Sequence, residues 1–567
     1  MKTTQTYDHY YKYDELTSLL KKYAEENPDY CLLEENATTP EGRKQWCMSI
    51  TKLSTGSFED KPAYGVNANI HAGEVTGTMA AMYFIDYLLT NKEDPEVDWL
   101  LSHFTVYVIP RITPDGAEYY LTTPYSVRSY PKFYPYEEDL PGLHPMDLDG
   151  DGVIRRMRVQ NPNGTFKISK DNPEIMVRRQ PDDIEGPFYD IYKEGIIKEK
   201  GGETAEKAEG EINPAPEHYA NDFNRNFPLN WYPENVQRGA GHYALCHSET
   251  AALASHMFKK KNMVAALNFH TAGGQYLFPP GHKHVKDCHP EDISVFRAFG
   301  KIATEETGYP AMNILDDYVG DASMIVAGDF DTFASYTLGI FDFTCECWNP
   351  VTRAGHPETW PRPKNIPDED IIAAYADVLK WLDENEGGKG YKSWTAFDHP
   401  QLGKVEIGGL DEKYVMQNPP ADFLQQECEK HTRYLLRTMK TLPRLALEVT
   451  SEHVDGDVYK IDAVVRNLGY LGTSGMKEAE TLGIARPVTV TLDGDLKMVT
   501  GEKEESAGIL EGSSGKKAML STYGPATLAH KPCEKHLTWV VLGKKGTKVK
   551  LEASSPRAGK VTVETEL

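Results

Sequence analysis

Residues 63–74 read AYGVNANIHAGE, an apolar run that ends in a histidine and, three positions later, a glutamate. The run predicts a buried strand, Gly73 permits a tight turn, and residues 75–89 then carry apolar side chains at helical spacing. His71 and Glu74 therefore lie where a strand gives way to a helix, so both can reach one ion. Imidazole nitrogen and carboxylate oxygen are ordinary zinc ligands. On its own, however, so short a motif is more often a surface turn.

Two further apolar runs supply partners for this motif. Residues 263–274 place His270 at the end of a second predicted strand, followed by glycines. Two histidines and one glutamate form the three-ligand set of a catalytic zinc site, whose fourth position is left to water. Residues 339–348 place Glu346 in a largely apolar strand, where an unpaired carboxylate is costly unless it has a role. Beside a zinc-bound water, Glu346 would act as the general base.

Five motifs in a fixed order carry a family resemblance. They are His71-Ala72-Gly73-Glu74, Thr113-Pro114-Asp115-Gly116, Asn224-Arg225-Asn226-Phe227, His270-Thr271 and Phe343-Thr344-Cys345-Glu346. Over roughly residues 7–385 the chain resembles the zinc metallocarboxypeptidases of the carboxypeptidase A type. The resemblance implies an α/β fold with a mixed sheet of about eight strands flanked by helices. It also implies one zinc ion, held by His71, Glu74 and His270.

The resemblance assigns roles to three more polar residues. Arg128 lies twelve positions beyond Gly116 and would polarise the scissile carbonyl and hold the oxyanion, unless it is a solvated loop arginine. A fixed cation there stabilises charge that develops only in the tetrahedral intermediate. Asn224 and Arg225 would bind the free carboxylate at a peptide's C-terminus, which suits the fork of a guanidinium group. This pair predicts an exopeptidase acting on peptides or peptide-like substrates with a free C-terminal carboxylate.

Two features of the family are not fixed by the sequence. A tyrosine on a mobile loop is expected at residues 324–325, but the nearest tyrosines, Tyr318 and Tyr336, are both displaced from that position. The base of the specificity pocket falls at Phe330 or at Asp331, depending on one gap. Phenylalanine would favour apolar C-terminal residues and aspartate basic ones, so both preferences stay open.

A long polar insertion, residues 129–220, separates the motifs. Within it, residues 147–154 read DLDGDGVI, which is similar to the first half of an EF-hand calcium loop. The candidate calcium ligands are Asp147, Asp149 and Asp151. The twelfth position of the loop is Arg158 instead of a carboxylate, so calcium would need ligands from elsewhere, such as Asp182 or Asp183. An acidic surface turn is the alternative interpretation.

The chain of 567 residues is too long for one hydrophobic core, so we expect several domains. Residues 1–386 are predicted to form the catalytic domain, which ends with a helix over 369–385 and a glycine-rich linker. Residues 387–443 form a connecting segment, with a helix over 421–441, that could pack back on the first domain. Residues 444–567 contain short alternating apolar runs separated by turn residues, which predict a β-sandwich, a binding or packing module.

The overall charge of −24, from 85 acidic and 61 basic residues, argues against nucleic acid or an anionic membrane as partner. The first residues, MKTTQTYD, lack the apolar core of a signal peptide, and no stretch of the sequence is apolar and long enough to span a bilayer. A cytoplasmic location is therefore expected, or secretion if a leader was removed. The eight cysteines are scattered, and Cys345 and Cys347 are expected to be reduced core residues. A zinc site at this pair is the alternative, although the spacing does not match a Cys-x-x-Cys knuckle.

The sequence thus predicts a zinc carboxypeptidase that hydrolyses the C-terminal peptide bond through a zinc-bound water activated by Glu346. One alternative is an amidohydrolase of the same fold that acts on peptidoglycan-derived or other acyl amino acids. The other is a catalytically inactive binding protein. The presence of Glu346 argues against the inactive protein, because a pure binder has no use for a buried base.

Overall fold

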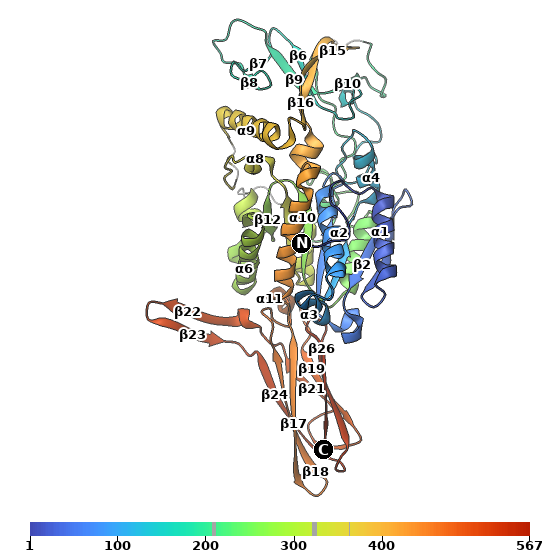
Figure 1. The fold of residues 1–567 in the computed structure, drawn as a ribbon, viewed down its shortest axis with the longest axis vertical. Helices are drawn as coiled ribbons and strands as arrows, with labels where there is room; N and C mark the ends of the chain where they lie inside the picture. The colour runs from blue at the N-terminus through green and yellow to red at the C-terminus, as the bar shows by residue number, and fades with distance from the viewer. Residues whose placement is uncertain (207–210, 320–325, 362, 364) are drawn as a thin grey trace.

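The structure, a computed structural model, describes residues 1–206, 211–319, 326–361, 363 and 365–567 (Figure 1). Its central element is a mixed sheet of eight strands. In spatial order these are β1 (Cys31–Thr38), β2 (Lys44–Ile50), β4 (Thr105–Ile109), β3 (Ala63–Ala68), β11 (Met263–Thr271), β14 (Phe341–Cys347), β12 (Gln275–Phe278) and β13 (Ala311–Asn313). The predicted mixed α/β sheet is therefore confirmed.

The middle of this sheet is parallel. Strands β4, β3, β11 and β14 run in one direction. Strands β1 and β2 pair antiparallel with their neighbours, and β12 pairs antiparallel with β14 but parallel with β13. Every residue of β3 and of β11 is buried. Strands that are covered on both faces need continuous apolar runs, which is why these two segments were recognisable in the sequence.

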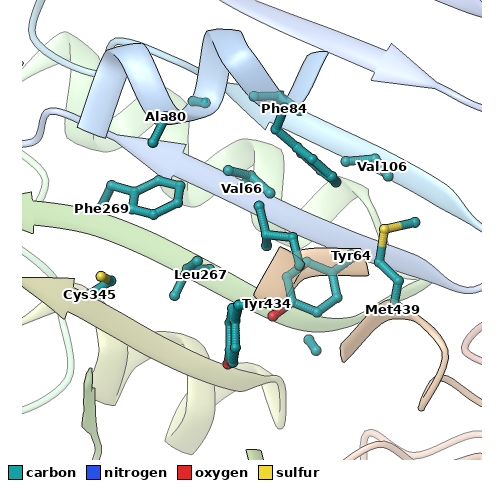
Figure 2. Packing of buried hydrophobic residues seen from close by; sticks show 14 of the residues in the cluster. Tyr64, Val66, Ala80, Phe84, Val106, Leu267, Phe269, Cys345, Tyr434 and Met439 are labelled. Carbon is teal, nitrogen blue, oxygen red and sulfur yellow. The ribbon is translucent and has the colours of Figure 1, made fainter. Parts of the chain in front are cut away.

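Helices cover both faces of the sheet. One face is covered by α1 (Tyr13–Glu26), α2 (Val75–Thr90), α3 (Pro95–His103), α6 (Pro290–Thr307) and α10 (Ala421–Met439), and the other by α5 (Ser248–Lys259) and α7 (Phe330–Leu338). Figure 2 shows Phe84 of α2 and Tyr434 of α10 beside Val66 and Leu267 of the sheet. The connecting segment thus packs back on the first domain through α10. No helix among the described residues is long and apolar enough to cross a membrane.

The insertion and the start of the connecting segment together form a second sheet of six strands, which the sequence did not predict. Its order is β15 (Tyr391–His399), β16 (Gly403–Leu410), β6 (Arg156–Gln160), β9 (Tyr189–Lys193), β7 (Phe166–Ile168) and β8 (Met176–Arg178). A two-stranded sheet, β5 (Gly142–Pro145) with β10 (Gly195–Lys198), lies beside it. The short helices α4 (Pro114–Thr122) and α8 (Pro350–Arg353) and the 19-residue helix α9 (Asp368–Glu386) lie toward the same end of the molecule (Figure 1).

The predicted C-terminal β module consists of two four-stranded sheets around a core of its own. One sheet contains β17 (Leu445–Asp455), β18 (Val458–Asn467), β24 (Glu534–Leu542) and β20 (Lys497–Thr500), and the other β21 (Glu504–Gly508), β19 (Val488–Gly494), β25 (Lys548–Ser555) and β26 (Gly559–Glu566). The short helix α11 (Lys477–Thr481) precedes β19. A separate hairpin, β22 (Lys516–Ser521) with β23 (Gly524–His530), projects to one side (Figure 1).

Arg557 joins the β module to the catalytic domain. Its guanidinium donates to the carbonyls of Leu338 and Gly339, where α7 ends, and to the carbonyl of Ser474. Burial lowers the pKa of Arg557 to about 10, so the group stays protonated near neutral pH. One partly buried cation therefore satisfies carbonyl groups from both parts of the chain.

Candidate metal centre

The first two predicted ligands lie in the turn between β3 and α2. Asn69 adopts a left-handed conformation (φ 62°), and its Nδ2 donates to the carbonyls of His71 (2.7 Å) and Ala72 (3.1 Å). These bonds fix the turn that presents His71 and Glu74. β11 lies next to β3 and runs parallel to it, so the carboxyl ends of both strands reach the same edge of the sheet. This arrangement brings His270 to the turn.

The three side chains converge on one point. Glu74 Oε1 lies 2.8 Å from His71 Nδ1, Glu74 Oε2 lies 2.9 Å from His270 Nδ1, and the two Nδ1 atoms are 3.2 Å apart. All three residues are buried. Despite its short distance to His270, Glu74 Oε2 accepts no well-formed hydrogen bond from the residues that the structure describes. Two imidazole nitrogens and a carboxylate that face each other in this way fit a zinc ion.

The electrostatics of these residues agree with a cation site. Burial alone would raise the pKa of Glu74, but the two imidazoles outweigh it and hold that pKa below its ordinary value. Burial also lowers the pKa of His270, but the Glu74 carboxylate outweighs burial and raises it to about 9. The pocket thus favours the anionic carboxylate and a positive charge beside it.

Asp222 is a residue of this site that the sequence analysis did not identify. It precedes the short helix Phe223–Arg225, and its Oδ1 lies 3.0 Å from His71 Nε2. A carboxylate that holds one ring nitrogen fixes the tautomer and turns the other nitrogen toward the metal position. Its position two residues before the Asn-Arg pair was the available signal, but the sequence alone did not link it to His71.

Arg128 lies beside the ligands, as predicted. Its Nε donates to Asp222 Oδ2 at 3.0 Å, and its Nη1 lies 3.7 Å from Glu74 Oε1. Burial would lower the pKa of Arg128, but the carboxylates of Asp222 and Glu74 raise it further above its ordinary value. The side chain is therefore a permanently charged, positioned cation, 38% exposed, at the edge of the ligand cluster.

Glu346 is the direct neighbour of His270 in the register between β14 and β11. Burial raises the pKa of Glu346 above its ordinary value, and the Glu74 carboxylate adds to this effect, whereas His270 and Arg128 oppose it. The side chain remains partly exposed. A carboxylate with a raised pKa beside a metal position can accept and release a proton near neutral pH.

Asn224 and Arg225 lie on the short helix that follows Asp222. Asn224 Oδ1 accepts a hydrogen bond from the backbone of Phe330 (2.7 Å), and Arg225 Nη1 donates to the Asn224 carbonyl (2.7 Å). Burial would raise the pKa of Asp222, but the charges of Arg128, His71 and Arg225 together hold it well below its ordinary value. The Arg225 charge also opposes the rise in the pKa of Asp329. Arg225 is thus placed within reach of both the ligand cluster and the start of α7.

The two candidates for the base of the pocket have different surroundings. Phe330 packs against Phe227 (ring centroids 5.0 Å apart) in the apolar core. Asp331 accepts hydrogen bonds from Asn268 Nδ2 (2.9 Å) and from Thr344 Oγ1 (2.5 Å). Asn268 and Thr344 stand two positions before His270 and Glu346 on their strands, so their side chains point to the same face of the sheet. Asp331 therefore faces the strands that carry the site.

Asp331 belongs to a buried group of three carboxylates. Asn268 Nδ2 also donates to Asp342 Oδ2 (2.6 Å), and Asp329 lies two residues away on the chain. Burial and the Asp331 charge raise the pKa of Asp329 to about 6 and raise that of Asp342 well above its ordinary value. Asp329 Oδ2 and Asp342 Oδ1 have no hydrogen-bond partner among the described residues. The sequence analysis gave Asp342 no role.

The predicted tyrosine position, residues 324–325, lies outside the described residues. Tyr318 stacks on Trp360 with ring centroids 5.2 Å apart, and the Tyr336 hydroxyl is buried and donates to Cys288 Sγ. Neither contact places a tyrosine at the ligand cluster, so this expectation stays a prediction.

The calcium prediction gains no support. Both oxygens of Asp147 accept backbone N–H groups, from Gly150 and Gly152 (2.9 Å each). The ammonium of Lys392 lies 2.6 Å from Asp149 and 3.2 Å from Asp151. A lysine from β15 thus neutralises two of the three carboxylates that were expected to bind the ion. Of the suggested distant ligands, Asp183 pairs with Lys167 instead.

Cys345 and Cys347 are free, buried thiols, and Figure 2 shows Cys345 among the core side chains. Their sulfurs are 3.7 Å apart, and Cys345 Sγ lies 3.7 Å from His431 Nδ1. That nitrogen is also 2.8 Å from the Tyr276 hydroxyl. Since a hydroxyl already accounts for the His431 nitrogen, the group fits a packed core with a satisfied histidine.

The chain belongs to the zinc carboxypeptidase family, because the model of that family matches residues 16–369. A second model, described as a domain of unknown function, matches residues 445–566. Among curated proteins, the chain is similar to zinc carboxypeptidase A 1 of Drosophila melanogaster, with 34% identity over 122 residues, which cover 21% of this chain and 28% of that protein. It is also similar to carboxypeptidase B of Astacus astacus, with 32% identity over 113 residues, 20% of this chain and 35% of that protein.

The matches to these two curated relatives span only about a third of their length. Among solved structures, carboxypeptidase A of Helicoverpa armigera matches with a TM-score of 0.38 and 15% identity, over 68% of this chain and 74% of that chain. The assignment to the family therefore depends on the family model.

Replacing His270 with alanine should abolish stoichiometric zinc binding, because two of three ligands cannot hold a catalytic zinc. Asp222→Ala should keep the ligands but weaken zinc affinity roughly 10- to 100-fold, because it frees the His71 ring. Elemental analysis after dialysis, with chelator competition for affinity, measures both. Stoichiometric zinc in the His270→Ala protein would show that the metal binds elsewhere.

Proposed function

We propose that this protein is a zinc-dependent carboxypeptidase that hydrolyses the last peptide bond of substrates with a free C-terminal carboxylate. The observation that carries the proposal is the convergence of His71, Glu74 and His270 on one point, with Glu346 in register beside His270. A metal-ligand set next to a carboxylate of raised pKa supports metal-assisted hydrolysis of a peptide bond.

When bound at this site, zinc supplies Lewis acidity for the attacking water and for the scissile carbonyl. Glu346 takes the proton from the water as its oxygen adds to the carbonyl carbon. Arg128 holds the negative charge that develops on the carbonyl oxygen, at a position fixed in advance by Asp222. Glu346 then gives its proton to the leaving nitrogen as the C–N bond breaks, and the products are a carboxylate and an amine.

Arg225 supports an exopeptidase in preference to an endopeptidase. Its guanidinium lies on the helix that directly follows Asp222, one residue beyond Asn224. A free terminal carboxylate is a planar acceptor that a guanidinium can bind with two parallel hydrogen bonds, whereas an internal peptide bond offers no such charge. This clamp would hold the substrate so that only its last peptide bond reaches Glu346.

The carboxylates of Asp329, Asp331 and Asp342 favour a substrate with a basic C-terminal side chain. They lie on the site's face of the sheet, and two of their oxygens have no partner among the described residues. Asn268, which contacts Asp331 and Asp342, lies two residues before His270 on β11. Because each strand residue rises about 3.3 Å, this group lies two such steps from His270 along the strand. A lysine or arginine side chain that reaches down from the site would neutralise it.

Glu346→Gln should keep the fold and the zinc but lower turnover by roughly 10²- to 10⁴-fold, because an amide cannot accept the water's proton. Steady-state kinetics on a protein of measured zinc content tests this. Near-normal turnover at full zinc occupancy would remove Glu346 from the mechanism.

Amidation of the substrate's C-terminus should weaken kcat/KM in the wild type by roughly the 1.5–3 kcal/mol of a hydrogen bond to a charged group. Arg225→Ala should show a similar loss with the free peptide. The two changes remove one interaction, so together they should cost little more than either alone. Equal cleavage of free and amidated peptides by the wild type would rule out the carboxylate clamp.

Among peptides that differ only in the last residue, lysine should be preferred over leucine, and Asp331→Asn should reduce this preference roughly 10-fold or more, the scale of a lost charge-assisted contact. Phe330→Leu is the matched control, because it changes the neighbouring residue of the same helix without changing charge. The ratio of kcat/KM for the two peptides is the readout. A leucine preference in the wild type that Phe330→Leu alters would assign the pocket to Phe330.

A further inference from the structure

We infer that Asn418, from the segment that connects the catalytic domain to the β module, is a positioning residue for the metal ligand Glu74. The residue lies outside the part of the chain that the family model matches. The inference rests on the proposed metal centre and adds to it a residue that contacts neither the metal position nor the substrate.

Helix α2 has an unusual requirement at its first turn. Its N-cap residue is Glu74, and the Glu74 side chain caps no N–H group of the helix. The first N–H groups of any helix lack partners within the helix, and a side chain at the N-cap usually accepts from one of them. Here that side chain faces two imidazoles instead, so the helix needs an acceptor from another part of the chain.

Asn418 supplies this acceptor. Its Oδ1 accepts from the Thr76 backbone N–H (3.1 Å) and from the Thr76 hydroxyl (2.8 Å). Its Nδ2 donates to the Gly73 carbonyl at 2.8 Å. One fully buried amide therefore binds the backbone on both sides of Glu74. Because the amide ties residues 73 and 76 together, it fixes where the Glu74 side chain leaves the turn.

The same segment also covers the turn. A Cβ atom at Gly73 would lie 2.8 Å from Gln417 Oε1 and 2.8 Å from the Tyr120 ring, so a larger residue there would require these side chains to shift. The Tyr120 hydroxyl is in turn 3.2 Å from Asn418 Nδ2. The turn is thus enclosed by Tyr120 of α4 and by Gln417 and Asn418, which follow it by more than 340 positions.

The segment is itself held in place, so it can act as a fixed support. Asp411 caps the short helix Glu412–Gln417 by accepting from the backbone of Lys413 (2.8 Å) and Tyr414 (3.0 Å). The Lys413 ammonium donates to two carbonyls at α4 and just beyond it, those of Tyr120 and Thr123 (2.7 Å each). Behind Asn418, the Tyr10 hydroxyl donates to the Pro419 carbonyl (2.7 Å).

A comparable asparagine elsewhere in the chain serves as a matched control. Asn467 is buried in the β module, where its Oδ1 accepts from the backbone of Arg444 (3.1 Å) and Gly469 (3.0 Å) and its Nδ2 donates to the Leu471 carbonyl (2.8 Å). Asn418→Ala removes five hydrogen bonds, two from Thr76 and one each to Gly73, Tyr120 and Lys413, and Asn467→Ala removes three, so each variant loses a buried amide that ties separate backbone segments together. Only Asn418 adjoins the ligand turn.

The test compares full-length wild type, Asn418→Ala, Asn418→Asp and Asn467→Ala. Each protein is stripped of metal, its melting temperature is measured, and its zinc affinity is determined by competition with a fluorescent chelator. Asn418→Ala should weaken zinc affinity roughly 10- to 100-fold, the usual scale for residues that support metal ligands. Asn418→Asp keeps the acceptor for Thr76 but loses the donor to Gly73, so it should show a smaller loss. Asn467→Ala should lower the melting temperature without changing zinc affinity.

The outcomes separate this inference from the proposed function. Zinc affinity in Asn418→Ala equal to that of the wild type, or an equal loss in Asn467→Ala, would overturn the positioning role. If Asn418→Ala does not fold, Asn418→Asp decides: an unchanged affinity in that variant overturns the inference. Absence of zinc binding in the wild type would overturn the metal centre and with it this role.

Discussion

The carboxylate of Glu74 is the constraint on which the rest of the catalytic domain depends. It is buried between two imidazoles, 2.8 and 2.9 Å from their Nδ1 atoms. A buried charge without a partner costs several kcal/mol in an environment that excludes water, on the order of what a whole domain has in net stability. The strands β3 and β11 must therefore end at the same edge with their histidines in this place. The parallel centre of the sheet, with Glu346 in register on β14, meets that condition.

Support for this cluster comes from several distant parts of the chain. Asp222, at the end of the insertion, orients His71 and holds Arg128. Asn418, in the connecting segment, accepts a hydrogen bond from the first turn of α2, the helix whose N–H groups the Glu74 side chain does not cap. The insertion and the connecting segment also share one sheet, in which Val405 of β16 pairs with Val159 of β6. The additions to the family domain are thus bound to each other and to the ligand turn.

The sequence was informative where a residue and its context lie close together. The predicted ligands His71, Glu74 and His270 and the predicted base Glu346 stand at or near the ends of apolar strands, so a local pattern was enough to propose them. The helix predicted over residues 75–89 is observed as Val75–Thr90. The same continuous apolar runs also led to the prediction of a mixed sheet, which the structure confirms.

Contacts between distant segments left no such local signal. The aspartates of residues 147–151 suggested calcium because the neutralising Lys392 is about 240 positions away and belongs to another strand. Asn418 was not singled out, since an asparagine in a loop gives no sign that it caps a helix far back in the chain. The sequence could not choose between Phe330 and Asp331 as the base of the proposed pocket. The hydrogen-bond partners of Asp331, which are Asn268 and Thr344, come together only in the folded sheet.

The contact made by Arg557 bears on how this chain loses its structure. Its guanidinium satisfies the last carbonyls of α7, and the first residues of the same helix are Phe330 and Asp331. Separation of the β module would break these charge-assisted hydrogen bonds and expose both the guanidinium and the carbonyls to water, at a net cost of about 1.5–3 kcal/mol per hydrogen bond. The two cores are therefore coupled thermodynamically, and the free energy of melting one includes the contacts of the other. The β module thus holds the C-terminal end of α7, the helix that carries both candidates for the base of the proposed specificity pocket.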